Sequence, residues 1–266
     1  MKLTILGTGN AIVTECYNTC FVLSNDDKHF LVDGGGGNTL LVQLKKTGIS
    51  FKDIHDIFVT HKHIDHLLGI IWIIRLVLQG KCRKMHEGDV RIYAPKEVVD
   101  ILLDLSIKLF NNKEAAYINN GLYFIAVEDK DTKTIIDKEV TFFDIHSSKD
   151  TQFGFSMKFD DNQVLTCLGD EPYNETEYEY VKNATWLLHE AFCLYSEADI
   201  FKPYEKHHST AKDACALARE MNVKNIVLYH TEDKNIANRK DLYINEGKEY
   251  FTGHIYVPDD LDIIEL

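Results

Sequence analysis

Short apolar runs rich in β-branched and aromatic residues recur along the chain and are separated by polar or glycine-containing turns. Such runs are typical of strands that are buried on one or both faces. The predicted strands are Leu3–Leu6, Cys20–Leu23, His29–Val32, Ile57–Thr60, Val90–Ala94, Leu122–Val127, Val140–Ile145, Phe153–Phe159, Val164–Leu168, Trp186–Leu188 and Ile226–Tyr229.

Helical patterns alternate with these strands in two stretches of the chain. Apolar residues at helical spacing predict helices at Asn38–Lys46, from Leu67, from Pro95 to about Phe110, and from Ser209 as N-cap onward. Strands mixed with helices in this way indicate an α/β protein whose helices cover the faces of two sheets. We expect one domain spanning residues 1–266, because no linker or repeat divides the chain.

The residue composition and the net charge exclude several classes of protein. The chain has 45% hydrophobic and 27% charged residues, which excludes a disordered protein, and its net charge of −13 disfavours a general nucleic-acid or anionic-membrane binder. The longest apolar run, Leu67–Leu78, is too short to span a membrane. The first residues lack a signal-peptide pattern, and the six cysteines form no Cys-x-x-Cys pair, so we expect a cytoplasmic protein with free thiols.

The strongest chemical signal is His61-Lys62-His63-Ile64-Asp65-His66, directly after a predicted strand. In extended chain, alternate residues point to the same side, so His61 and His63 can bind one ion. Asp65 and His66 begin the next helix and can face a second ion. Imidazole and carboxylate groups are ligands of zinc and related divalent ions. Three histidines and an aspartate within six residues therefore predict a metal site.

Further ligands are expected at other strand ends. His146, Asp170 and His230 each stand at the C-terminal end of an apolar run, where α/β folds build their sites. Taken singly, each residue also fits a structural role, as a buried hydrogen-bonded histidine or a turn aspartate after glycine.

At this point the sequence resembles the metallo-β-lactamase superfamily over nearly its whole length, and most closely the ribonuclease Z branch. The motifs that carry the resemblance, in family order, are Leu6-Gly7-Thr8-Gly9, Val32-Asp33-Gly34-Gly35-Gly36, Thr60-His61-Lys62-His63-Ile64-Asp65-His66 with Leu68-Gly69, His189-Glu190-Ala191, His208-Ser209-Thr210 and Tyr229-His230-Thr231.

The resemblance implies a four-layer αβ/βα sandwich and a centre of two divalent metal ions, zinc first, with manganese or iron as alternatives. It implies the following ligands: His61, His63 and His146 for the first metal, Asp65, His66 and His230 for the second, and Asp170 between them.

The same resemblance implies roles around the metals. Asp33 would support ligand histidines, and Asp65 would accept a proton from the attacking water. Glu190 and His208 would line the reacting site, with His208 donating to the substrate phosphate or the leaving oxygen. Taken alone, His208 adjoins His207 in a segment that has the pattern of an exposed loop, and Glu190 resembles a surface carboxylate after a strand.

Two departures from ribonuclease Z shift the expected substrate. Only 24 positions separate His146 from Asp170 (146 to 170), which leaves no room for the family's tRNA-binding arm. The loop at Val13–Asn18 keeps only Asn18 of the family's basic Pro-x-Lys-x-Arg-Asn pattern. We therefore expect a phosphodiesterase acting on small or cyclic nucleotides or short RNA ends. The alternatives are tRNA 3′ processing, glyoxalase II-like thioester hydrolysis, and a non-catalytic metal-binding sensor.

The segment Leu67–Leu78 also predicts an assembly. Its apolar side chains point around the whole helix, whereas a helix on the outside of a sandwich needs only one apolar stripe. Burial under the helix from Pro95 is one explanation. Ribonuclease Z-like enzymes dimerise through helices in this region, so we expect a homodimer with Trp72 or its neighbours near the two-fold axis.

Overall fold

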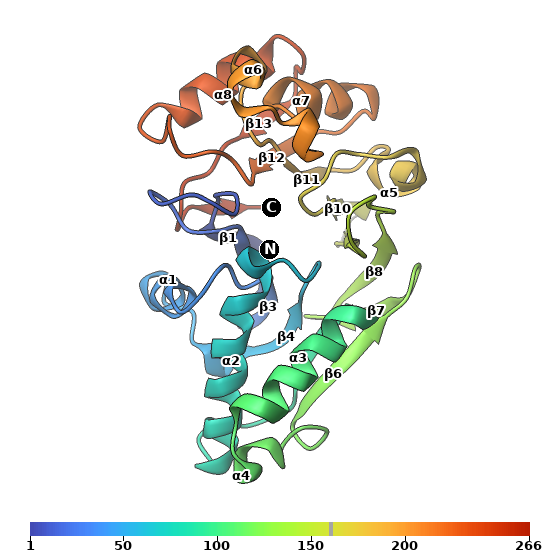
Figure 1. Cartoon of the computed structure of the whole chain (residues 1–266). Coiled ribbons are helices and arrows are strands. Elements are labelled where there is room, and N and C mark those ends of the chain that lie inside the picture. Colours follow the sequence, from blue (N-terminus) through green and yellow to red (C-terminus); the bar gives the residue numbers. More distant parts are fainter. Residues whose placement is uncertain (160–161) are drawn as a thin grey trace.

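Two seven-stranded sheets pack face to face in the computed structural model, which describes residues 1–159 and 162–266 (Figure 1). The first sheet has the order β14-β1-β2-β3-β4-β5-β6, in which β1, β2 and β14 are antiparallel to their neighbours and β3 to β6 are parallel. Its strands are β1 (Lys2–Gly7), β2 (Cys20–Asn25), β3 (Lys28–Val32), β4 (Ile54–Phe58), β5 (Val90–Pro95), β6 (Leu122–Val127) and β14 (Ile263–Glu265).

The second sheet has the order β13-β12-β11-β10-β9-β8-β7, with antiparallel pairing from β7 to β10 and parallel pairing from β10 to β13. Its strands are β7 (Thr132–Ile135), β8 (Lys138–Asp144), β9 (Phe153–Lys158), β10 (Val164–Cys167), β11 (Trp186–Glu190), β12 (Asn225–Tyr229) and β13 (His254–Tyr256).

Helices cover the outer face of each sheet. On the first sheet lie α1 (Thr39–Thr47), α2 (Ile64–Cys82), α3 (Lys96–Leu109) and the short α4 (Asn112–Ala115), and on the second lie α5 (Tyr178–Val181), α6 (Ala198–Phe201), α7 (Ala211–Glu220) and α8 (Arg239–Lys248) (Figure 1). Single 3₁₀ turns occur at Phe51–Asp53, Glu175–Glu177, Tyr195–Glu197 and Tyr204–Lys206. None of the described helices could span a membrane.

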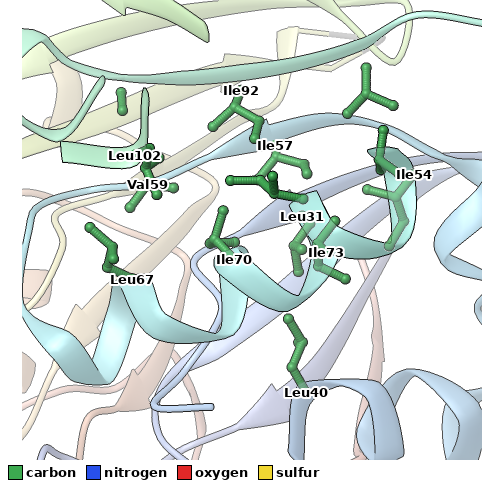
Figure 2. Packing of buried hydrophobic residues seen from close by; sticks show 14 of the residues in the cluster. Leu31, Leu40, Ile54, Ile57, Val59, Leu67, Ile70, Ile73, Ile92 and Leu102 are labelled. Atoms are coloured by element: carbon green, nitrogen blue, oxygen red, sulfur yellow. The ribbon is translucent and has the colours of Figure 1, made fainter. Parts of the chain in front are cut away.

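Alternation along the strands builds three apolar layers. In β2, Phe21 and Leu23 face the other sheet, whereas Cys20 and Val22 face the helices. Figure 2 shows the outer layer of the first sheet, where Ile70 and Ile73 of α2 lie over strand residues such as Leu31. The layers of helix, sheet, sheet and helix confirm the predicted αβ/βα sandwich. The two sheets share one apolar layer, and the division of the chain into domains stays a prediction.

Several boundaries differ from the prediction. β4 runs from Ile54 to Phe58 rather than from Ile57 to Thr60, and β11 extends to Glu190. The N-cap of α7 is Thr210 and not Ser209, because Thr210 and Asp213 form a reciprocal capping box. The short elements α4, α5, α6, β7, β13 and β14 and helix α8 are absent from the prediction. Asp160 and Asp161, between the predicted strands Phe153–Phe159 and Val164–Leu168, lie outside the described residues.

Candidate metal centre

The predicted ligands from both sheets meet at the edge where the parallel strands end. Asp170 follows β10 and its Oδ2 atom lies 3.7 Å from His61 Nε2, 3.5 Å from His66 Nε2 and 3.5 Å from His230 Nε2. Asp65 Oδ2 lies 3.4 Å from His66 Nε2 and 3.6 Å from His230 Nε2. Three overlapping groups result, each with ligand atoms within 4.8 Å of one another: His61–His66–Asp170, Asp65–His66–His230 and Glu190–His208–His230.

Two glycines bring the start of α2 against the loop after β3. Gly34 N–H donates to His66 O at 2.8 Å, and Gly69 N–H donates to Gly35 O at 2.9 Å. A Cβ on Gly69 would lie 1.8 Å from Gly34 O, so no side chain fits there. This close approach places Asp65 and His66, in the first turn of α2, beside the strand ends.

Asp33 holds His66 directly and His61 through Thr60. Its carboxylate accepts from Thr60 N–H and Thr60 Oγ1, both at 2.9 Å, and its Oδ2 lies 2.7 Å from His66 Nδ1. Thr60 Oγ1 in turn lies 2.9 Å from His61 Nδ1. With Nδ1 engaged on both rings, Nε2 is the atom that faces the carboxylates. Asp33 thus has the supporting position that the family resemblance implied.

The cluster has the properties that divalent cations require. The Nε2 atoms of His61, His66 and His230 are buried, and none has a hydrogen-bond partner within residues 1–159 and 162–266. Such orphaned acceptors are costly unless something binds them. The donor set of imidazole nitrogens and carboxylate oxygens is one that zinc and similar ions accept.

The protonation states of His61 and Asp170 also suit metal binding. Burial lowers the pKa of His61 to about 3, which keeps its imidazole neutral. Burial alone would raise the pKa of Asp170, yet His61, His66 and His230 hold it well below its usual range. Neutral imidazole and ionised carboxylate are the forms that bind metals. Around His66, burial is outweighed by Asp33, Asp65 and Asp170, which raise its pKa well above the usual range and mark an excess of negative charge.

His63 and His146 lie at the rim and not in the buried cluster. The His63 ring is 4.4 Å from that of His61, but its side chain is 41% exposed and its Nε2 lies 3.1 Å from Asp150 Oδ2. His146 has φ +53°, its side chain is 52% exposed, and its Nδ1 is 3.8 Å from Asp144 Oδ2. Five of the seven predicted ligands are therefore brought together. The ligand roles of all seven residues stay predictions.

Glu190 and His208 stand beside the cluster. Glu190 ends β11 with no exposed surface, and its carboxyl group accepts from Ser209 N–H and, at 3.2 Å, from Phe192 N–H. Burial raises its pKa well above the usual range. His208 Nδ1 lies 3.6 Å from Glu190 Oε2, and its ring is 5.3 Å from that of His230. The readings of Glu190 as a surface carboxylate and of His208 as an exposed loop residue are wrong, because the α7 N-terminal loop folds over β11.

Two residues at the site had no signal in the sequence. Gln152 is buried and donates from Nε2 to Asp170 Oδ1, which fixes that carboxylate. Asp150 contacts both His63 and Lys62, the latter at 2.5 Å, and so ties the His146 loop to the His61–His66 motif. Both precede β9 in an ordinary polar stretch, and only tertiary structure gives them a function.

Comparisons with known proteins agree with this geometry. A family model described as Anti-Pycsar protein Apyc1 matches residues 1–251. Among curated relatives, ribonuclease Z of Haloferax volcanii is 25% identical over 312 aligned positions, which cover 100% of this chain and 95% of that protein.

Solved structures share the fold. The metallo-β-lactamase fold protein YhfI from Bacillus subtilis superposes with a TM-score of 0.76 at 18% identity, covering 99% of this chain and 98% of that one. Human tRNase Z, short form, superposes with a TM-score of 0.75 at 22% identity, covering 100% and 99%. The metallo-β-lactamase fold is thus confirmed. The chain is a metal-dependent hydrolase of this fold, and it belongs to the family described as Anti-Pycsar protein Apyc1.

Proposed function

We propose that the chain is a two-metal phosphodiesterase whose substrates are small or cyclic nucleotides or short single-stranded RNA ends, with a cyclic mononucleotide as the leading candidate. The observation that carries the proposal is the short connection between His146 and Asp170. β9 and β10 pair directly, with Lys158 opposite Val164, and Phe159 N–H donates to Gln163 O at 2.7 Å. Only residues 160–162 lie between those two partners, so no tRNA-binding arm is accommodated there.

The comparison with ribonuclease Z of Haloferax volcanii supports the same substrate class. The alignment has 312 positions whereas the chain has 266 residues, so at least 46 positions (312 less 266) belong to segments that this chain lacks. A net charge of −13 gives no long-range attraction to a polyanion such as tRNA. A small diester needs only a local cationic centre, which is what the cluster would provide once loaded with metal.

The roles of the side chains follow from their positions. Two bound divalent cations, zinc first and manganese or iron as alternatives, would supply Lewis-acid chemistry that neutralises the phosphate and acidifies a water. His61 and His66 are held by Thr60 and Asp33 in the orientation that leaves Nε2 free. Asp65 would accept the proton of the attacking water, since its carboxylate is ionised and faces the cluster.

His208 and Glu190 would act on the substrate side of the centre. We infer that His208 donates a hydrogen bond to the phosphate or the leaving oxygen, since its ring borders the cluster at His230. Glu190 would hold the segment that carries His208, because it accepts from the backbone of Ser209, the next residue. His63 and His146 would close the first metal site from the rim.

We also infer a homodimer and a cytoplasmic location. Ile70, Ile73 and Ile74 of α2 are fully buried, yet a stripe of Ile64, Leu68 and Trp72 on the same helix is 69%, 38% and 40% exposed. A symmetric contact would cover this stripe on both subunits. Light scattering should give twice 30.6 kDa, and a mass of one chain at micromolar concentration would contradict the dimer. The six free cysteines suit a reducing compartment.

The experiment that tests the function is a substrate panel with metal-loaded protein. It contains a cyclic mononucleotide, bis(p-nitrophenyl) phosphate, p-nitrophenyl phosphate, a thioester and a tRNA precursor, and Asp170→Asn is the inactive control. We expect turnover of both diesters and little of the monoester, thioester or tRNA. Preferred cleavage of the precursor would support tRNA processing instead, preferred thioester cleavage would support a glyoxalase II-like activity, and metal binding without turnover of any substrate would support a sensor.

A further inference from the structure

The aromatic ring of Phe192 lies flat against the imidazole of His208. The two ring centroids are 4.7 Å apart and the planes differ by 6°. Phe192 is only 5% exposed and belongs to no strand or helix, since it follows β11 by two residues. Nothing in its sequence environment distinguishes it from an ordinary core phenylalanine.

One edge of the His208 ring is not held by a hydrogen bond. Its Nδ1 atom is buried without a hydrogen-bond partner among the described residues, and Glu190 Oε2 at 3.6 Å is beyond a normal hydrogen bond. The backbone is held, because His208 N–H donates to Pro203 O at 2.9 Å. The ring also hydrogen-bonds to the Asp170 backbone. A single bond at the ring leaves its plane able to turn about that bond, so a further contact is needed to fix the plane.

Phe192 is itself held firmly enough to supply that constraint. Its N–H donates to Ser209 O at 3.0 Å and to Glu190 Oε2 at 3.2 Å, and its carbonyl accepts from Glu232 N–H at 2.8 Å. Lys206 Nζ lies over the Phe192 ring, 4.9 Å from its centroid. The phenyl ring is therefore a fixed surface beside the segment that carries His208.

We propose that Phe192 is a positioning residue whose ring sets the plane of the His208 imidazole relative to the substrate. Stacking at this distance stabilises one ring orientation and disfavours rotation about χ2. Small misplacements of a reacting group cost up to ~10²-fold in rate, so orientation of His208 matters for catalysis. The proposal rests on the proposed function for the role of His208, whereas the geometry of the stack can be tested without it.

A double-mutant cycle on the diester substrates tests the catalytic part. We expect Phe192→Leu to lower kcat about 10-fold with little change in KM and with two metals retained, and Phe192→Tyr, which keeps the flat ring, to restore most of the rate. In a His208→Ala background, Phe192→Leu should change kcat less than ~2-fold, because its effect passes through the missing imidazole.

The matched control is Phe251→Leu, which removes the same atoms from a buried phenylalanine (4% exposed) in the outer apolar layer of the second sheet. It should lower the melting temperature and leave kcat unchanged. A loss of kcat from Phe192→Leu that is equal with and without His208 would make Phe192 a general packing residue and overturn the proposal.

A spectroscopic measurement keeps the proposal testable even if no diester is hydrolysed. In ¹H–¹³C spectra of the metal-loaded protein, the His208 Hε1 resonance, identified by its loss in His208→Ala, should carry a ring-current shift that Phe192→Leu abolishes and Phe192→Tyr keeps. An unchanged resonance in Phe192→Leu would overturn the stack. Absence of all diester turnover in the wild type would instead reject the proposed function.

Discussion

The metal centre has a buried side and an open side that are built in different ways. On the buried side, His66, His230 and Asp170 are each less than 5% exposed. His66 donates from Nδ1 to Asp33, and Asp170 accepts from Gln152. On the open side, His63 and His146 are about half exposed and are held by single contacts to Asp150 and Asp144. The buried side is preorganised by the two sheets, whereas the open side depends on the loop from 146 to 150.

This difference predicts which of the two metal ions should bind tightly and which should exchange easily with solvent. A buried and preorganised site binds its ion tightly, since the ligands need no ordering on binding. A site with solvent-exposed ligands on a loop releases its ion more easily and leaves room for substrate. We therefore expect the two metals to differ in affinity, with the second metal, at Asp65, His66 and His230, the tighter one.

The largest effect should come from Asp170, which faces three histidines that we propose as ligands of the two metals. Asp170→Asn removes the negative charge that three histidines face, so we expect loss of bound metal and a fall in kcat of at least ~10³-fold. Elemental analysis and diester turnover are the measurements. Asp104→Asn, on the exposed face of α3, is the control and should change neither. Full metal content in Asp170→Asn would contradict its central position.

Next is His208, which borders the buried side without a ligand role. His208→Ala should keep both metals and lose about 10²-fold in kcat, the usual scale for a positioned donor. His207→Ala, on the exposed neighbour, is the matched control. Turnover at the wild-type rate in His208→Ala would remove His208 from the mechanism.

Replacement of the rim histidines, His63 and His146, tests whether the metal on the open side binds independently of the metal on the buried side. His63→Ala and His146→Ala should each weaken the first metal about 10- to 100-fold and leave the second in place, so the metal content falls from two toward one. Titration with zinc or manganese, followed calorimetrically, gives both affinities. His254→Ala, an exposed histidine in β13, is the control. Two unchanged affinities in His146→Ala would mean that the loop does not close over a metal.

The smallest predicted effect concerns Glu177, a buried residue near the His146 loop on the open side of the metal centre. Glu177 is buried near Glu171, whose carboxylate accepts from Ser147 Oγ in the His146 loop at 2.7 Å, and burial raises the pKa of Glu177 to about 8. The folded state favours its neutral form, so this contribution to stability is complete below pH 4.5 and is lost as the pH rises to about 8.

Glu177→Gln cannot ionise and keeps the acceptor for Asn174 N–H. Relative to wild type, it should be nearly neutral at pH 4.5 and stabilising by on the order of 2 kcal/mol at pH 9. Denaturant unfolding at the two pH values measures the difference. Glu175→Gln, two residues away on the same turn, is the control. An equal effect at both pH values would contradict the raised pKa of Glu177.

Much of the fold could be predicted from local pattern. The continuous apolar runs of β1 and β2 and the helical spacing in α3 are set by which residues avoid water, and this holds whatever the neighbours are. The edge elements β13 and β14 could not be predicted in this way. They are only three residues long and gain their stability from pairing with β12 and β1, far away in the sequence.

The sequence by itself determined which metal-binding groups are neighbours, because His61, Asp65 and His66 lie within six residues between β4 and the first turn of α2. Tertiary structure decided what distant segments contribute. The left-handed backbone at His146 leaves its ring at the rim, the α7 loop buries Glu190, and Phe192 meets His208 across 16 positions (192 to 208). The physical reason is that short-range order follows from the local chain, whereas burial, side-chain direction and stacking depend on which surfaces pack together.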